Sequence, residues 1–419
     1  MTVRRLAAVD AQTYWMSASV PDDQFLLYAF DGRAPDLGSV LTTIRSRARA
    51  CPEFGLRVDD SNSWSYPGWA PRDLGADQIV VHELSEPGWQ RCLDAVTALG
   101  ADQLDAREIT WRLHIFPKID DVPGVGEGTV AVLQICHALS DGVRSSALAA
   151  YLFGRPGDVP AVAESTVTSA SLPLRAFRAA RAHRRLVRDT TAGLVPAQAD
   201  SRPVLRSNTR PSGTRGLRTV VCRRAQLAGP TVTVGALVAV SEALSGHLRE
   251  LGDDPSALGA EVPMAKPGPR AANNHFGNVG VGLYPDLAAA PRARAIAAEL
   301  QQRRRRAAHP AMRAEAAAFA ALPAPLLRWG VRQFDPQLRS ATVTGNTVVS
   351  SVNRGAKDLR FGAAAVTLTA GFPTLSPMMG ITHGVHGIGD TVVVSVHAAQ
   401  SAIGDIDSYL DRLTRALSC

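Results

Sequence analysis

Short apolar runs alternate with helical patterns along the whole chain, and this order limits the possible folds more than any other feature. The runs 24–30 (QFLLYAF), 79–84 (IVVHEL), 111–116 (WRLHIF) and 129–137 (TVAVLQICH) have the length and composition of buried strands. Between them, 40–54 and 87–99 space their apolar residues as helices do. The chain therefore predicts a mixed α/β fold.

The chain is long enough for two similar halves. Its 419 residues, 46% of them hydrophobic, can bury more core than one domain usually carries. A loop at 155–172 and a helix at 175–188 precede the best linker, 191–217, which is rich in proline and glycine. We predict an N-terminal subdomain at 1–190, this linker, and a C-terminal subdomain at 218–419.

The second half repeats the mixture of strand and helix patterns. It opens with a strand-type segment at 218–227 and a helix at 233–251, followed by an extended region at 273–285. A long helical stretch is predicted from Arg292 to about Phe319. The remaining candidates are strands at 347–352, 364–369 and 391–398 and a closing helix at 405–417.

Composition excludes several classes of protein. The start of the chain lacks the apolar stretch of a secretory signal, and no run of about 18 apolar residues indicates a membrane span. The five cysteines (Cys51, Cys92, Cys136, Cys222, Cys419) form no CxxC pair, which favours reduced thiols in the cytoplasm. Basic residues outnumber acidic ones, 45 to 38, but the basic clusters lack interleaved aromatics, so nucleic-acid binding is not expected.

The stretch 136–142, CHALSDG, carries the strongest chemical signal. His137 lies at the end of an apolar strand, and a histidine is the side chain best suited to take a proton from an alcohol near neutral pH. Asp141 can fold back to pair with an arginine or hold the backbone, and Gly142 suits a tight turn beside a substrate. The alternative is a structural histidine followed by an Asp-Gly turn.

Together with the two α/β halves and the linker, the H-x-x-x-D-G pattern resembles the chloramphenicol acetyltransferase-like superfamily, which includes peptide-synthetase condensation domains. Within it, the chain most resembles the bacterial wax ester synthase/diacylglycerol acyltransferase family. The similarity lies in five segments: RLAAVDAQTYWM (5–16), REITWRLHIF (107–116), TVTVGALVAVSEAL (231–244), FGNVGVGLYP (276–285) and VVSSVNRG (348–355).

The resemblance implies two acetyltransferase-like subdomains, each a mixed sheet flanked by helices, with a tunnel between them. Acyl-CoA would be the co-substrate, with no permanently bound cofactor, and a long-chain alcohol or diacylglycerol the acceptor. His137 would deprotonate the hydroxyl, while Asp141 and Gly142 shape the turn. Ser350, Ser351 and Asn278 are the candidate donors to the oxyanion.

The chain departs from the family pattern at defined positions. Cys136 stands where the family has a first histidine, and Thr233-Val234 replace its Asn-Asp pair. Cys136 and Thr233 therefore belong to the candidate substrate-binding set. Two alternative functions are an acyltransferase that acts on a specialised-metabolite hydroxyl or amine, and a catalytically silent relative that binds lipid. A Cys136 nucleophile is disfavoured, because strand alternation points it away from His137.

Other features have two interpretations each. The arginines of 175–188 fall on one helix face, which suits contact with a membrane or lipid droplet or, alternatively, plain solvation. Arg303 to Arg306 either meet CoA phosphates or form a solvated face. His383 and His386 lie in a Gly-rich segment interpreted as a hairpin turn; no third ligand accompanies them, so no metal site is predicted. His114 and Trp111 are interpreted as structural residues.

Overall fold

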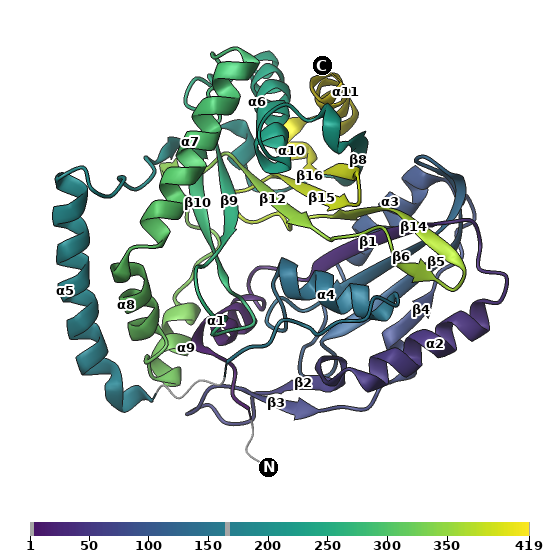
Figure 1. The fold of residues 1–419 in the computed structure, drawn as a ribbon, viewed down its shortest axis with the longest axis horizontal. Helices are drawn as coiled ribbons and strands as arrows, with labels where there is room; N and C mark the ends of the chain where they lie inside the picture. Colours follow the sequence, from purple (N-terminus) through teal and green to yellow (C-terminus); the bar gives the residue numbers. More distant parts are fainter. Residues whose placement is uncertain (1–3, 164–167, 419) are drawn as a thin grey trace.

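The computed structural model describes residues 4–163 and 168–418, and two six-stranded sheets dominate it (Figure 1). The first has the order β13-β14-β1-β6-β5-β4 and the second β10-β9-β12-β15-β16-β8. The strands of the first are β1 (Gln24–Asp31), β4 (Ile79–Val81), β5 (Trp111–Val122), β6 (Gly126–Ile135), β13 (Arg360–Phe361) and β14 (Ala364–Gly371). Those of the second are β8 (Arg215–Arg223), β9 (Gly259–Ala265), β10 (Phe276–Gly282), β12 (Thr347–Asn353), β15 (Ile381–Ile388) and β16 (Thr391–Ala399).

Helices and two short strand pairs complete the fold. The strand pairs are β2 (Leu56–Asp59) with β3 (Gly68–Pro71) and β7 (Arg202–Pro203) with β11 (Thr342–Val343). The helices are α1 (Ala8–Met16), α2 (Leu37–Ala50), α3 (Trp89–Leu99), α4 (Gly142–Leu152), α5 (Leu172–Thr191), α6 (Val232–Glu250), α7 (Ala289–Ala307), α8 (Pro310–Phe319), α9 (Ala324–Arg332), α10 (Gln400–Ile403) and α11 (Ile406–Leu417).

Strand β1 shows why the first sheet is covered on both faces. Its residues are apolar at every position from Phe25 to Phe30, so neither face of the strand suits water. Leu26, Tyr28 and Phe30 pack with α2 and α4 in one core, whereas Phe25, Leu27 and Ala29 pack with α3 in another. The uninterrupted apolar run thus places this strand in the interior.

The two lobes share core and strands. Strand β14 comes late in the sequence, yet it pairs antiparallel with β1 in the N-terminal sheet, with Leu26 opposite Gly371 and Phe30 opposite Val366. The core behind α3 also includes Leu217 of β8 and Val393 of β16 from the second sheet. The second sheet has its own core against α6, α7 and α11. The proposed boundaries at 190 and 218 remain predictions.

Two predicted elements differ from the structure. The stretch from Arg292 to Phe319 is not one helix: α7 ends at Ala307 and α8 begins at Pro310, which has no backbone N–H to continue the ladder. The segment 382–387, interpreted as a hairpin turn, is instead the interior of strand β15 and is buried between β12 and β16.

The cysteines and the first loop are described only in part. Cys51, Cys92, Cys136 and Cys222 are buried free thiols, as predicted for reduced cysteines, and Cys419 lies outside the described residues. The predicted loop at 155–172 includes residues 164–167, which also lie outside them, and α5 already begins at Leu172. Within 4–163 and 168–418, no helix is both long and apolar enough to cross a membrane.

Candidate active site

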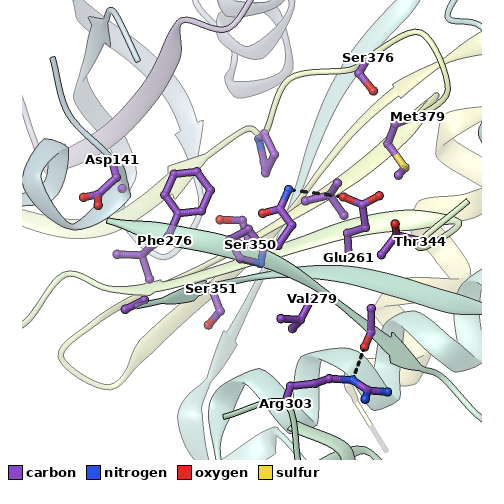
Figure 2. Close-up of a pocket in the computed structure, with 18 of the residues that line it drawn as sticks. Asp141, Glu261, Phe276, Val279, Arg303, Thr344, Ser350, Ser351, Ser376 and Met379 are labelled. Carbon is purple, nitrogen blue, oxygen red and sulfur yellow. Dashed lines mark hydrogen bonds between the residues drawn. The ribbon is translucent and has the colours of Figure 1, made fainter. Parts of the chain in front are cut away.

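A large cavity lies where the two lobes meet. It has a volume of about 1080 Å³ and is lined by residues of both sheets, including His137, Asp141 and Gly142 of the motif. Phe276 and Val279 of β10 and Ser350 and Ser351 of β12 line it from the second lobe, as Figure 2 shows. The structure therefore brings residues more than two hundred positions apart in the sequence into one wall.

His137 lies two residues beyond the end of β6. A backbone bond from Cys136 N to Thr110 O, 2.9 Å, prolongs the pairing, and Leu139 N bonds Cys136 O at 3.0 Å to turn the chain toward α4. The half-buried imidazole stacks on Phe276, with ring centroids 5.7 Å apart and planes 24° apart. Strand, turn and stacking together fix the ring in the cavity wall.

The environment favours the neutral ring. Burial lowers the pKa of His137, while its own carbonyl, Asp141 and Asn274 act in the opposite direction. Its Nδ1 is enclosed and has no hydrogen-bond partner among the described residues. A neutral imidazole with one enclosed nitrogen can accept a proton at the other, Nε2.

Asp141 holds the turn. Its Oδ1 accepts from Arg144 N at 3.1 Å and caps α4, which is the usual role of an aspartate before a helix. Its Oδ2 accepts from Arg270 Nη1 at 2.6 Å and from His275 N at 2.9 Å. As the sequence suggested, Asp141 pairs with an arginine and also holds backbone.

Gly142 begins α4, directly against the second lobe. A Cβ at this position would lie 3.2 Å from Cγ2 of Val352, next to the end of β12. The glycine is required here for close approach rather than for an unusual backbone angle, because its φ is not positive. It lets β12 lie beside the helix start and His137.

Three residues that the sequence analysis left without a role support the motif from behind. Asp10 of α1 is 2% exposed and accepts from the backbone N–H groups of Asn273 and Asn274, both at 2.9 Å. Asn274 Nδ2 donates to Asp10 Oδ1 and, at 2.8 Å, to the carbonyl of His137. Asn273 Nδ2 donates to Ala138 O at 3.1 Å. Asp10 lies inside one matching segment, but nothing local in the sequence links it to His137.

The remaining candidates divide into two groups. Ser350, Ser351 and Asn278 line the cavity, and Thr233 Oγ1 donates to Ser351 Oγ at 3.0 Å from behind it. Asn278 Nδ2 makes a long bond of 3.4 Å to Glu261, drawn as a dashed line in Figure 2. Cys136 and Thr233 are not among the cavity-lining residues. Cys136 is buried in the core, where burial raises the pKa of its thiol.

The histidine pair of β15 does not form a metal site. His383 is enclosed by Thr347 Oγ1 at 2.9 Å and Tyr409 OH at 2.6 Å, whereas His386 lines the cavity. Across 4–163 and 168–418, no three His, Cys, Asp or Glu side chains gather as metal ligands do. Trp111 is fully buried, and His114 bonds to His82 and Gln134.

The four arginines at 303–306 on α7 differ in how far they are buried and bonded within the fold. Arg303 donates to Gly280 O at 3.0 Å and Ala197 O at 2.8 Å and pairs with Glu299, so its donors are occupied within the fold (Figure 2). Arg306 also lines the cavity and donates to Pro196 O at 2.9 Å. Arg304 and Arg305 between them are exposed.

Comparison with known proteins gives a family match to part of the chain and a structural likeness over nearly all of it. Residues 273–419 match the family model described as the WS/DGAT C-terminal domain. The chain is also similar in structure to the wax ester synthase/diacylglycerol acyltransferase from Marinobacter aquaeolei VT8. The TM-score is 0.64 and the identity 16%, with 99% of this chain and 98% of that chain covered.

Condensation domains have the same architecture. The starter condensation domain of rhizomide synthetase RzmA, in a double mutant with C8-CoA and Leu-SNAC, has a TM-score of 0.61 at 14% identity; the match covers 99% of this chain and 93% of that one. A single-mutant structure of the same domain with C8-CoA gives 0.60 at 13% identity, over 100% and 94% of the two chains. Comparison with curated protein sequences gave no match.

The chain therefore has the two-lobed fold of these wax ester synthase and condensation-domain structures, and its motif histidine faces a cavity between the lobes. The family match covers about a third of the chain, residues 273–419, which resembles the WS/DGAT C-terminal domain; the likeness to the solved structures, at 16% identity or less, concerns the fold.

Proposed function

We propose that this protein transfers the acyl group of an acyl-CoA to a hydroxyl of a long-chain alcohol or diacylglycerol, with His137 as general base. The observation that supports it is the imidazole itself: burial lowers its pKa, Phe276 stacks on it, and it lies in the wall of the interlobe cavity. Such a group is unprotonated near neutral pH and held where a substrate can reach it.

The reaction balances without a covalent acyl-enzyme. The hydroxyl oxygen attacks the thioester carbonyl as His137 Nε2 takes its proton. The tetrahedral oxyanion then collapses, the carbon–sulfur bond breaks, and the CoA thiolate leaves with the proton returned by the imidazolium. The products are an ester and CoA with a free thiol. Asp141 would hold the turn and carry no proton, since its carboxylate is engaged by Arg270 and His275 N.

Ser351 is the favoured donor to the oxyanion. Its Oγ accepts a hydrogen bond from Thr233, so its own O–H is left to donate into the cavity that it lines. Thr233 then acts as a positioning residue through Ser351. Ser350 and Asn278 are the other candidates, but the amide of Asn278 already contacts Glu261. Cys136 would contribute only by packing behind the motif.

Acyl-CoA as the partner fits the relatives. The RzmA condensation domain, which shares this fold, has been solved with C8-CoA. Arg306 lines the cavity and has no carboxylate partner among the ion pairs of the described residues, so its positive charge is available to a phosphate of CoA. Arg303, whose donors are bonded within the fold, would contribute less.

We further propose that α5 brings the protein to a membrane or lipid droplet. The predicted arginine face (Arg175, Arg178, Arg181, Arg185, Arg188) lies on this helix, which runs along the edge of the molecule beside α8 (Figure 1). Leu174 and Phe177 at its start are 54% and 66% exposed. Basic and exposed apolar side chains on one surface helix suit an anionic lipid interface.

The decisive experiment measures thiol release from acyl-CoAs of varied length with a panel of hydroxyl and amine acceptors. His137→Ala is expected to lower kcat/KM by about a hundredfold or more, the usual contribution of a general base. His82→Ala is the matched control: it removes a half-buried histidine that does not line the cavity, and should keep activity. Turnover that survives His137→Ala would refute the base assignment.

The same panel separates the alternatives. A preference for a compact hydroxylated or amine acceptor would favour a specialised-metabolite acyltransferase, an outcome to which Thr233-Val234 in place of the family's Asn-Asp pair draws attention. No turnover with any acceptor, from a protein that binds lipid, would favour the silent relative.

A further inference from the structure

Arg354, directly after β12, is a cation placed inside the cavity wall. Its backbone is held from both sides, because its N–H donates to Gly387 O and its carbonyl accepts from Arg155 Nη1, both at 2.8 Å. The side chain is 5% exposed and lines the cavity. A firmly held backbone and an enclosed side chain fix where its charge lies.

The guanidinium lacks an acidic partner. Nη1 donates to Thr369 Oγ1 at 2.7 Å, and the group lies 5.0 Å from the ring centroid of Tyr28. Nε is enclosed without a hydrogen-bond partner, and among the ion pairs of the described residues none includes Arg354. Burial lowers the pKa of Arg354, yet a guanidinium keeps its proton in proteins. A buried charge left in this state is costly unless a ligand compensates it.

His386 of β15 adds a second polar atom at the same place. Its Nδ1 is enclosed without a partner, and burial together with the charge of Arg354 holds its pKa well below the ordinary value. A Cβ built on Gly371 would lie 2.9 Å from both Arg354 Nη2 and His386 Nε2. The two atoms therefore converge where β14 has no side chain, and both residues line the cavity.

The carboxyl groups of the cavity leave this charge unpaired. Glu261 receives the amide of Asn278, and Asp23 receives Gln134 Nε2 and Leu104 N, both at 2.7 Å. Burial raises the pKa of Asp22 to about 8 and that of Asp23 to about 6, so each has a reduced tendency to ionise. None of these three carboxyl groups forms an ion pair with Arg354.

We propose that Arg354 and His386 recognise a carboxylate on the acceptor, so that the acceptor is a hydroxy acid and not only a neutral alcohol. The inference rests on the proposed function, whose acceptor class it narrows. One carboxylate oxygen would accept from Arg354 Nη2 and the other from the Nε2–H of neutral His386. Arginine suits this task because its donors are fixed in a plane that matches a carboxylate.

The arrangement also favours the acceptor over the phosphates of CoA as the source of the anion. The site is 95% enclosed at Arg354 and offers two open donor atoms, which matches one small singly charged group. The phosphates of CoA are multiply charged and strongly hydrated, and burial there would strip that water. Exposed or half-exposed arginines at the cavity suit them better.

A binding experiment on the full chain tests the inference without requiring turnover. Calorimetric titration compares decanoate, decanol and decylamine, which share a chain and differ in the head group. We expect wild type to bind decanoate most tightly. Arg354→Gln should weaken decanoate binding by about 10- to 100-fold, the range for a hydrogen bond to a charged group, and leave decanol unchanged. Arg33→Gln, an exposed arginine paired with Glu127, is the matched control.

Turnover then gives the functional arm. With ω-hydroxydecanoate and decanol as competing acceptors, Arg354→Gln should reduce the preference for the hydroxy acid mainly through KM, and Arg354→Lys should restore part of it. Equal binding of the three ligands by wild type would overturn the inference, as would an unchanged decanoate preference in Arg354→Gln. The inference would also be overturned if the only effect of Arg354→Gln were weaker binding of CoA.

The controls keep this proposal separate from the proposed function. If wild type turns over no acceptor, the transferase proposal fails, while the decanoate comparison still decides the carboxylate site. His137→Ala should abolish turnover and keep decanoate binding. Circular dichroism checks that Arg354→Gln folds. If it does not fold, the same three ligands are compared on wild type and Arg354→Lys. The carboxylate site is refuted if neither of these two proteins prefers decanoate.

Discussion

His137 is supported by a chain of contacts that begins at the N-terminal helix. Asp10 fixes Asn273 and Asn274, and Asn274 in turn holds the carbonyl of His137. Asp141 holds the other side of the same turn through Arg270. The proposed base is thus positioned by residues from three distant parts of the sequence, which is what a precise proton transfer requires.

The first prediction at this scale concerns pH. Since burial places the pKa of His137 below 6.5, most of the imidazole is unprotonated at neutral pH. The active form is the neutral ring, so kcat/KM should stay level as pH falls from about 8 and decline only once pH drops through that lowered pKa. A profile from about pH 5 to about pH 8 checks it, and a decline beginning well above pH 6.5 would contradict it.

Asp10, which supports the motif from behind, titrates within the same pH range as His137 and needs a control. Burial raises the pKa of Asp10 to about 6, so protonation of Asp10 contributes to any loss of kcat/KM at low pH. Asp10→Asn removes that titration while keeping a carbonyl oxygen as acceptor. If the decline at low pH keeps its position in this variant, Asp10 is not its source. Asp22→Asn and Asp23→Asn serve the same purpose for the two cavity carboxyls whose pKa values burial raises to about 8 and about 6. A decline that keeps its position in all three variants belongs to His137.

The sequence identified some of these residues and not others, for a physical reason. His137, Asp141 and Gly142 are adjacent, so their pattern is visible in one short stretch. Asp10 and Asn274 lie 264 positions apart and meet only through the fold. Arg354 lies within the segment 348–355, but its lack of an acidic partner is a property of its surroundings and leaves no trace in the sequence.

At the scale of elements, strands β14 and β15 cross at two glycines. A Cβ on Gly384 of β15 would lie 2.1 Å from the carbonyl oxygen of Gly371 on β14 and 2.5 Å from Ser395 Oγ. The two glycines let β14 of the first sheet lie directly against β15 of the second sheet. In the sequence, the glycines of 382–387 are interpreted as a turn signal. In the structure they lie within a strand, and Gly384 allows this close approach.

The crossing makes a specific prediction about stability. Gly384→Ala should destabilise the fold by about 1 to 3 kcal/mol or more, because the new methyl group meets backbone that cannot move aside. Gly387→Ala on the same strand is the control, since its Cβ would find no neighbour closer than 3.9 Å. Chemical denaturation of both variants measures the difference. Equal free energies of unfolding would show that the crossing can relax.

For the molecule as a whole, the two lobes are interdependent. The predicted division at 191–217 follows composition, and strand and helix patterns were recognisable in both halves. Yet β14 leaves the second half to complete the first sheet, and Leu217 and Val393 contribute to the core behind α3. Local patterns specify which segments are strands, but the sheet that each strand joins depends on packing between distant segments. That choice could not be inferred from composition.

The position of α5 in the whole molecule gives the last prediction. His183 and Leu186 line the cavity, whereas Arg178 and Arg181 of the same helix face solvent. A membrane bound to the outer face would therefore lie beside the cavity that we propose for apolar substrates. We expect the protein to sediment with vesicles containing anionic lipid, and less so at high salt, because screening weakens charge attraction.

The variants separate this helix from the general positive charge of the protein. Arg178→Gln with Arg181→Gln should weaken vesicle binding by about thirtyfold, at roughly 1 kcal/mol for each basic residue near the surface. Arg223→Gln with Arg224→Gln removes the same charge from an exposed site at the end of β8 and should change binding little. If both pairs reduce sedimentation equally, net charge and not α5 governs attachment. The apolar side chain then becomes decisive, because Phe177→Ser weakens binding at high salt only if α5 inserts.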